Sequence, residues 1–140
     1  SPEALEARSR WGIQAGHVAA KELPHLIGAA DILVQPGMPG PFDDCRFPSK
    51  LTFFLASGRP VITAPTNIGK LLRDGEHCLY LHDSSAGDIA AQVRRLMENR
   101  DLARKIGENG RAFARQHFSW ERAAAAVESF YLKWGFPHGK

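Results

Sequence analysis

The sequence has little cysteine, no long apolar run and no strong excess of charge of one sign. Its 140 residues include two cysteines, Cys45 and Cys78, whose spacing matches neither a metal site nor a redox motif. Both thiols are therefore expected to be reduced, which favours a cytoplasmic location. No stretch approaches the roughly 18 consecutive apolar residues of a membrane-spanning helix, and no signal-peptide pattern opens the chain.

The net charge of +3 is too small to indicate nucleic acid as a partner. Basic side chains do gather in the C-terminal third, where acidic side chains alternate with them. This pattern favours a solvent-exposed, ion-paired helical face, with peripheral contact to the inner face of the membrane or nucleic-acid binding as alternatives. No aromatic side chains stand among these charges to stack on bases, so nucleic acid is not expected. The basic residues are Arg94, Arg95, Arg100, Arg104, Lys105, Arg111, Arg115 and Arg122.

Short apolar runs alternate with segments of helical periodicity, which indicates an α/β fold with parallel strands joined by crossover helices. With 44% hydrophobic residues, the chain can build one domain around one core. The predicted strands are Ala15–Val18, Asp31–Gln35, Pro60–Thr63 and His77–Leu81. The predicted helices are Glu3–Gly12, Glu22–Ala30, a helix from Pro48 that ends before Gly58, Asp88–Asn99, a helix capped by Asp101 that ends at His117, and a last helix capped by Ser119.

The last predicted helix carries a wide apolar stripe. Such a stripe has to be buried against another surface, either within this domain or beyond it. Its members are Trp120, Ala123, Ala124, Val127, Phe130, Tyr131 and Trp134.

Two loops are the places to look for a ligand. In parallel sheets ligands bind outside the carboxyl ends of the strands. The loops Pro36–Phe47 and Ala64–Gly69 follow two of the predicted strands. The first is rich in glycine and proline and contains two adjacent carboxylates, and the second leads into another helical segment.

The same region resembles a known family. The residues that carry the resemblance are Ala30-Asp31-Ile32-Leu33-Val34 with Pro36, Pro48-Ser49-Lys50-Leu51, Leu55-Ala56-Ser57-Gly58-Arg59-Pro60-Val61-Ile62, Asp74-Gly75-Glu76-His77-Cys78-Leu79 and Phe118-Ser119-Trp120-Glu121. In their order and spacing they resemble the donor-binding half of GT-B glycosyltransferases of the large retaining family 4, also called glycosyl transferase group 1. The resemblance spans roughly residues 10–134.

The resemblance implies a Rossmann-like sheet and the C-terminal half of a GT-B fold, with residues 1–140 as a single partial domain. It implies a parent enzyme that transfers a sugar, with retention, from a nucleotide-diphosphate sugar to a glycan or lipid-linked acceptor. The acceptor-binding N-terminal domain and the family's Arg/Lys clamp for the diphosphate lie outside this sequence. The chain alone is therefore expected to be inactive, and neither a cofactor nor an active-site metal is expected.

The residues expected to hold the diphosphate lie in two places. Lys50, beside Ser49, falls in the first turn of the helix from Pro48, where the helix dipole and free N–H groups already favour anions. The turn from Asn67 to Gly69 could present backbone N–H groups to a phosphate. The alternatives are a solvated lysine and an ordinary helix-capping turn.

The residues expected to face the sugar are Asp43 and Asp44. The family usually carries two glutamates separated by seven residues, for the sugar and the ribose, and these positions hold Cys45 and Phe53 here. The neighbouring aspartates could supply the missing carboxylate, although loop-solvating turn residues are the simpler interpretation. The loss of both glutamates also supports a non-catalytic interaction module that no longer binds a donor.

The nucleotide base is expected near Gly16 and His17, which match a family loop close to the base. An ordinary surface histidine is the alternative. No other histidine has a spacing that suggests a metal ligand or a nucleophilic triad.

Overall fold

The computed structural model describes residues 10–135, so most of the predicted helix Glu3–Gly12 lies outside the described residues. Within them, a three-stranded parallel sheet has the order β1-β2-β3, formed by β1 (Leu33–Gln35), β2 (Val61–Thr63) and β3 (Leu79–Tyr80). Leu33 pairs with Val61, and Ile62 pairs with Leu79. The predicted parallel α/β sheet is confirmed, with each strand shorter than its apolar run.

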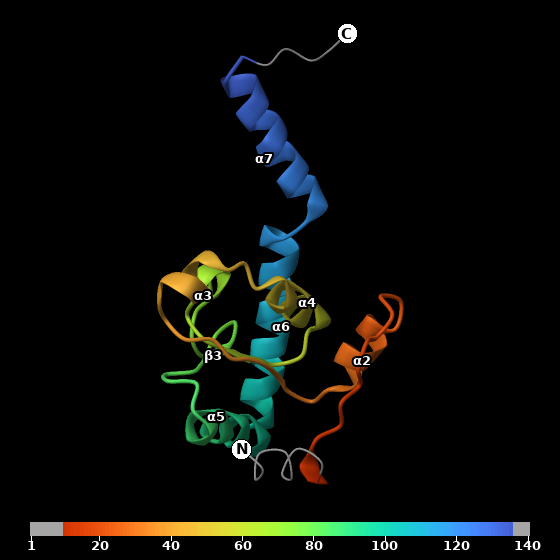
Figure 1. Ribbon diagram of the computed structural model, residues 1–140, viewed down its shortest axis with the longest axis vertical. Coiled ribbons are helices and arrows are strands. Elements are labelled where there is room, and N and C mark those ends of the chain that lie inside the picture. Colours follow the sequence, from red (N-terminus) through yellow and green to blue (C-terminus); the bar gives the residue numbers. More distant parts are fainter. Residues whose placement is uncertain (1–9, 136–140) are drawn as a thin grey trace.

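Helices flank the sheet, and α6 runs through the middle of the molecule (Figure 1). The long helices are α2 (Leu23–Ala29), α4 (Ser49–Ser57), α5 (Ala86–Glu98), α6 (Arg100–His117) and α7 (Trp120–Lys133). The predicted loops also contain the short helix α3 (Pro41–Cys45) and the 3₁₀ helix η1 (Asn67–Leu71). Both are too short to produce a helical period in the sequence.

The sheet is buried on both faces. Val61 of β2 packs into a cluster with Leu51 and Leu55 of α4, whereas its neighbour Ile62 packs into a second cluster with Leu96 of α5 and Ile106 of α6. Successive side chains of a strand point to opposite faces, so one strand can fill two clusters. Burial of both faces explains why the strands read as continuous apolar runs.

Helix α6 packs unusually closely on α4 because it presents glycine there. A Cβ at Gly107 would overlap the carbonyl oxygen of Gly58, and one at Gly110 would lie 3.0 Å from the carbonyl oxygen of His77 and 3.1 Å from Leu55 Cδ2. Gly58 itself ends α4 with a φ of 78°, a left-handed conformation that suits glycine, as predicted. The backbone of α6 is therefore in contact with the end of α4 at a position where any residue with a Cβ would keep the two apart.

Three details of the sequence prediction are wrong. Residues 15–18 form no strand, and all but Val18 are exposed, so they have no sheet neighbour to pair with. Asn99 rather than Asp101 caps α6, because its Oδ1 accepts from the N–H of Leu102 at 2.9 Å. Helix α5 begins at Ala86, where the hydroxyl of Ser85 accepts from the N–H of Asp88. The predicted Ser119 cap of α7 is confirmed.

Helix α7 projects away from the rest of the molecule (Figure 1), and none of its residues is buried. The apolar stripe of α7 therefore does not pack within this domain: Trp120 is 88% exposed and Phe130 is 57% exposed. None of the helices within residues 10–135 is long and apolar enough to cross a membrane.

His77 is held against α6 by aromatic contacts. Its ring lies 4.8 Å from that of Phe113, which in turn stacks on His117 at 4.3 Å. Its Nδ1 accepts a hydrogen bond from the N–H of Arg73. Burial lowers the pKa of His77, with Arg73 and His117 adding to the effect and Glu76 opposing it.

Replacing Gly107 with alanine should destabilise the fold by about 1–3 kcal/mol, because the added methyl group has to push α6 away from Gly58. Gly87→Ala in α5 is the matched control, since its Cβ would meet only the Ser85 hydroxyl at 3.9 Å. That change should be neutral or slightly stabilising. Chemical denaturation measures both, and equal effects of the two substitutions would contradict the packing argument.

The fold should lose stability as the pH falls below about 6.5, the usual pKa of histidine. Below that pH the histidine of the unfolded chain is protonated, whereas folded His77 stays neutral because its pKa is lowered. The free energy of unfolding therefore falls with the pH until the pH drops below the pKa of folded His77. His77→Gln should flatten the pH dependence of the melting temperature between neutral and mildly acidic pH, while His25→Gln, at an exposed site, should leave it unchanged. An unaltered profile for His77→Gln would refute this assignment.

Candidate functional site

The loops that follow the three strands are joined to one another at the carboxyl edge of the sheet. The hydroxyl of Ser84, after β3, donates to the carbonyl oxygen of Gly37, after β1, at 2.6 Å. Ser84 has a φ of 56°, and its N–H is one of three successive N–H groups that donate to the carboxylate of Asp88. Side chains thus hold the first and third loops together.

The first and second loops meet through Asp44 of α3. The side-chain amide of Asn67 donates to the carbonyl oxygen of Asp44 at 2.8 Å, and the ammonium group of Lys70 lies 2.8 Å from Asp44 Oδ1. Asn67 has a φ of 45°, a left-handed conformation that asparagine tolerates better than most residues. The structure therefore brings together two of the predicted site residues, Asp44 and Asn67, and adds Lys70, which the sequence analysis missed.

Asp43 stabilises its own loop. One carboxylate oxygen accepts from the N–H of Met38 at 2.7 Å, and the other lies 3.0 Å from the guanidinium group of Arg46. The side chain is only 16% exposed. A sugar hydroxyl would have to compete with both of these partners, so Asp43 is less available than the sequence suggested.

The turn at Gly69 is tightly built. A Cβ there would lie 2.5 Å from the carbonyl oxygen of Ala64, so the close approach requires glycine. The N–H of Gly69 donates to Thr66 and that of Ile68 donates to the side chain of Asn67. These two N–H groups are engaged within the chain, so the predicted phosphate cradle stays a prediction that needs other donors.

Tyr80 supports this turn from β3. Its hydroxyl oxygen lies 2.8 and 2.9 Å from the carbonyl oxygens of Gly69 and Leu72, and these two acceptors share its one O–H donor. Burial raises the pKa of Tyr80 to about 12, with Cys78 and Asp74 adding to the effect, so the hydroxyl remains a donor at physiological pH.

Lys50 lies in the first turn of α4 and is exposed. Within residues 10–135 it forms no ion pair, unlike Arg46 and Lys70. Ser49 precedes it at the start of the same helix, and its carbonyl oxygen accepts from the hydroxyl of Thr52. The ammonium group of Lys50 is therefore available to an anionic ligand.

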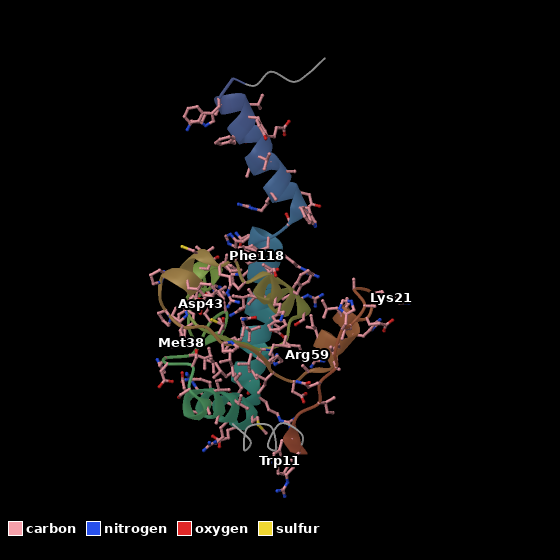
Figure 2. All side chains as sticks on the ribbon, in the orientation of Figure 1. Trp11, Lys21, Met38, Asp43, Arg59 and Phe118 are labelled. Carbon is pink, nitrogen blue, oxygen red and sulfur yellow. The ribbon has the colours of Figure 1, made fainter. Side chains whose placement is uncertain are left out.

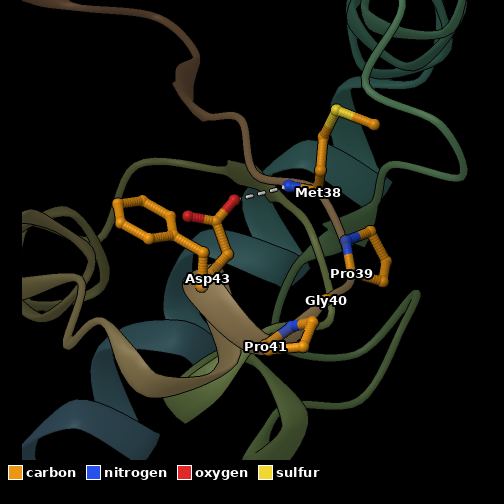
Figure 3. Close-up of a pocket in the computed structure, with 6 residues that line it drawn as sticks. Met38, Pro39, Gly40, Pro41 and Asp43 are labelled. Carbon is orange, nitrogen blue, oxygen red and sulfur yellow. Dashed lines mark hydrogen bonds between the residues drawn. The ribbon is translucent and has the colours of Figure 1, made fainter.

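A hollow of about 240 Å³ opens on the first loop and is lined by Met38, Pro39, Gly40, Pro41, Phe42 and Asp43 (Figure 3). Met38 and Phe42 are 68% and 77% exposed. Sequence analysis did not predict this apolar rim, and its only signal there was the proline and glycine content of the loop. Its side chains could contact the non-polar face of a ring-shaped ligand.

The remaining positions differ in how close they lie to this cluster: Cys45 directly follows Asp44, whereas Gly16 and His17 lie away from it. Cys45, which ends α3, is exposed, and Phe53 on α4 is 58% exposed. Gly16 and His17 are exposed and belong to the segment between Trp11 and Lys21, which lies across the molecule from Met38 and Asp43 (Figure 2). The structure does not bring Gly16 and His17 to the loops of the sheet. In the part of the chain that is described, no three His, Cys, Asp or Glu side chains are grouped to hold a metal ion.

Comparison with known proteins identifies the family. The family described as glycosyl transferase-like matches residues 6–129. Similar proteins include a D-inositol 3-phosphate glycosyltransferase of Corynebacterium aurimucosum, 32% identical over 79% of this chain and 25% of its own length. An MMP alpha-(1->4)-mannosyltransferase of Mycolicibacterium hassiacum is 26% identical over 81% of this chain and 27% of its own length.

Solved structures agree on the fold. Sucrose-phosphate synthase from Thermosynechococcus elongatus matches with a TM-score of 0.78 and 24% identity, covering 94% of this chain and 33% of that one. HepE of Anabaena, solved in complex with UDP-glucose, matches with a TM-score of 0.70 and 20% identity over 91% of this chain and 36% of that one.

A third structure consists of the matching domain alone. The C-terminal domain of the group 1 glycosyl transferase LpcC from Francisella tularensis gives a TM-score of 0.67 and 21% identity, covering 85% of this chain and 62% of that one. This chain spans between 13% and 29% of the length of the curated relatives it matches. The chain belongs to the glycosyl transferase-like family and has the fold of the C-terminal domain of GT-B glycosyltransferases.

Proposed function

We propose that this chain is the donor-binding domain of a retaining glycosyltransferase that transfers a sugar from a nucleotide-diphosphate sugar to a glycan or lipid-linked acceptor. The observation that carries the proposal is the joining of the strand-end loops around Asp44, Asn67 and Lys70, with Lys50, which forms no ion pair within residues 10–135, in the first turn of α4. A bound UDP-glucose in HepE, which shares the fold, supports a nucleotide sugar as the ligand.

Glycosyl transfer makes one main electrostatic demand. The leaving nucleoside diphosphate gains negative charge, and preorganised positive groups stabilise it best. Lys50 supplies such a charge where the helix dipole of α4 has the same sign. The hollow at Met38–Asp43 would accommodate part of the sugar, and Asp44 would accept hydrogen bonds from its hydroxyl groups.

The remaining parts of the proposal concern the whole enzyme. An N-terminal domain would bind the acceptor, and the family's Arg/Lys segment at the start of the donor domain would supply the rest of the diphosphate clamp, so this chain alone would not catalyse transfer. The reaction would take place in the cytoplasm, with the enzyme in peripheral contact with the membrane when the acceptor is lipid-linked. No metal would be needed, because lysine side chains would provide the positive charge.

An interaction module that no longer binds a donor is the second candidate. Cys45 and Phe53 replace the family's glutamates, and both aspartates of the loop are engaged within the chain. The exposed apolar stripe of α7 would then be the interaction surface. Nucleotide binding separates this candidate from the first.

Titration of the chain with UDP, GDP and ADP, followed by amide chemical shifts, should identify one nucleotide that binds. The shifts should concentrate in residues 36–50 and 66–70, because these loops meet at the carboxyl edge of the sheet. Shifts confined to α7, or no shift with any of the three even for a chain extended through the family's Arg/Lys segment, would favour the interaction module.

Lys50→Ala should weaken binding of that nucleotide by about tenfold, the loss typical of one charge-assisted contact. Lys105→Ala is the matched control, because Lys105 is an exposed lysine of α6. Titration calorimetry at one salt concentration compares the two variants. Equal nucleotide affinities of the two variants would show that Lys50 does not contact the nucleotide.

A further inference from the structure

We infer that Lys70 is a second diphosphate ligand of the donor site and that Asp44 regulates it by competing for its ammonium group. This inference rests on the proposed function and deepens it. The observation behind it is the contact of 2.8 Å between Lys70 Nζ and Asp44 Oδ1, which joins the loop after β2 to the loop after β1.

The position of Lys70 is fixed from both sides. The backbone that carries it follows the turn at Asn67, whose amide group is bound to the carbonyl oxygen of Asp44. Gly69 in the middle of η1 is buried, and the hydroxyl of Tyr80 bonds to the carbonyl oxygens of Gly69 and Leu72. The stem of Lys70 therefore leaves a rigid turn directly at the junction of the two loops.

The ammonium group of Lys70 remains accessible. Its side chain is 53% exposed, so a ligand in solvent can reach Lys70, whereas Asp44 is 34% exposed and its Oδ1 atom is buried. An ion pair with this much exposure contributes little stability and is easily exchanged for a stronger partner. A diphosphate is such a partner, because it carries more charge than one carboxylate and offers several acceptor oxygens.

The neighbouring charges leave Lys70 as the exchangeable cation. Arg46 is engaged by Asp43, whose second oxygen is bound to the N–H of Met38. Both oxygens of Asp43 are therefore engaged, and Asp43 does not replace Asp44 as the ion-pair partner of Lys70. Lys50 forms no ion pair within residues 10–135 and would bind the anion without giving up a partner. The diphosphate would then take over Lys70, with Asp44 released toward the sugar.

The first test compares UDP with uridine, which lacks the phosphates. Lys70→Ala should weaken binding of UDP by about tenfold and leave binding of uridine unchanged, whereas Lys70→Arg should retain most of the affinity for UDP. Lys105→Ala again serves as the control. Equal losses for UDP and uridine would mean that Lys70 only supports the turn, and would overturn the inference.

The second test uses the competition itself. Asp44→Asn removes the competing charge and should tighten binding of UDP by about threefold in the native background. In the Lys70→Ala background the same change should have no effect, because the cation that it frees is absent. A gain of the same size in both backgrounds would show that Asp44 acts by general repulsion, and would overturn the regulatory part of the inference.

The controls also separate the two levels of the proposal. If the native chain binds UDP and Lys70→Ala binds it equally well, the donor site stands and the role of Lys70 is refuted. If neither the native chain nor a chain extended through the family's Arg/Lys segment binds UDP, GDP or ADP, the proposed function and this inference both fail. Thermal unfolding of each variant verifies that its fold is intact. We expect an intact fold because a partly exposed ion pair contributes little to stability.

Discussion

The close approach of two backbones, α6 at Gly107 and the end of α4 at Gly58, is the constraint on which the rest of the structure depends. It sets the position of α4 on the sheet, with Leu51 and Leu55 directed into the core. The chain then passes from Gly58 directly into β2. Because one contact fixes both the helix and the strand that follows it, the first turn of α4 and the loop after β2 have defined positions relative to each other. The candidate site is built on these two positions.

Within that frame, most polar groups of the loops serve the loops themselves. Asp43 binds Met38 and Arg46, Ser84 binds Gly37, and Asp88 gathers three N–H groups of the third loop. These hydrogen bonds order the loops before any ligand binds, so ligand binding costs less conformational entropy. A preorganised site of this kind gains affinity by losing little entropy, even with few direct contacts.

The sequence predicted the sheet and most helices because burial on both faces leaves strong apolar runs, as in Val61 and Ile62. It did not predict α3, and it placed a helical segment only after the loop in which η1 begins; both have about one turn and follow proline and asparagine chemistry rather than a period. The cap at Asn99 was missed because Asp101 is an equally good capping residue by type. The pair of Asp44 and Lys70 joins separate loops, so only the tertiary structure could reveal it.

The two cysteines differ in a way that has a practical consequence. Cys78 is fully buried, and burial together with the nearby Asp74 raises the pKa of its thiol to about 12. Cys45 is exposed at the end of α3, immediately after Asp44. A maleimide dye would therefore attach at one position in the folded chain without any engineering of cysteines. Its fluorescence would report ligand binding at the edge of the loops.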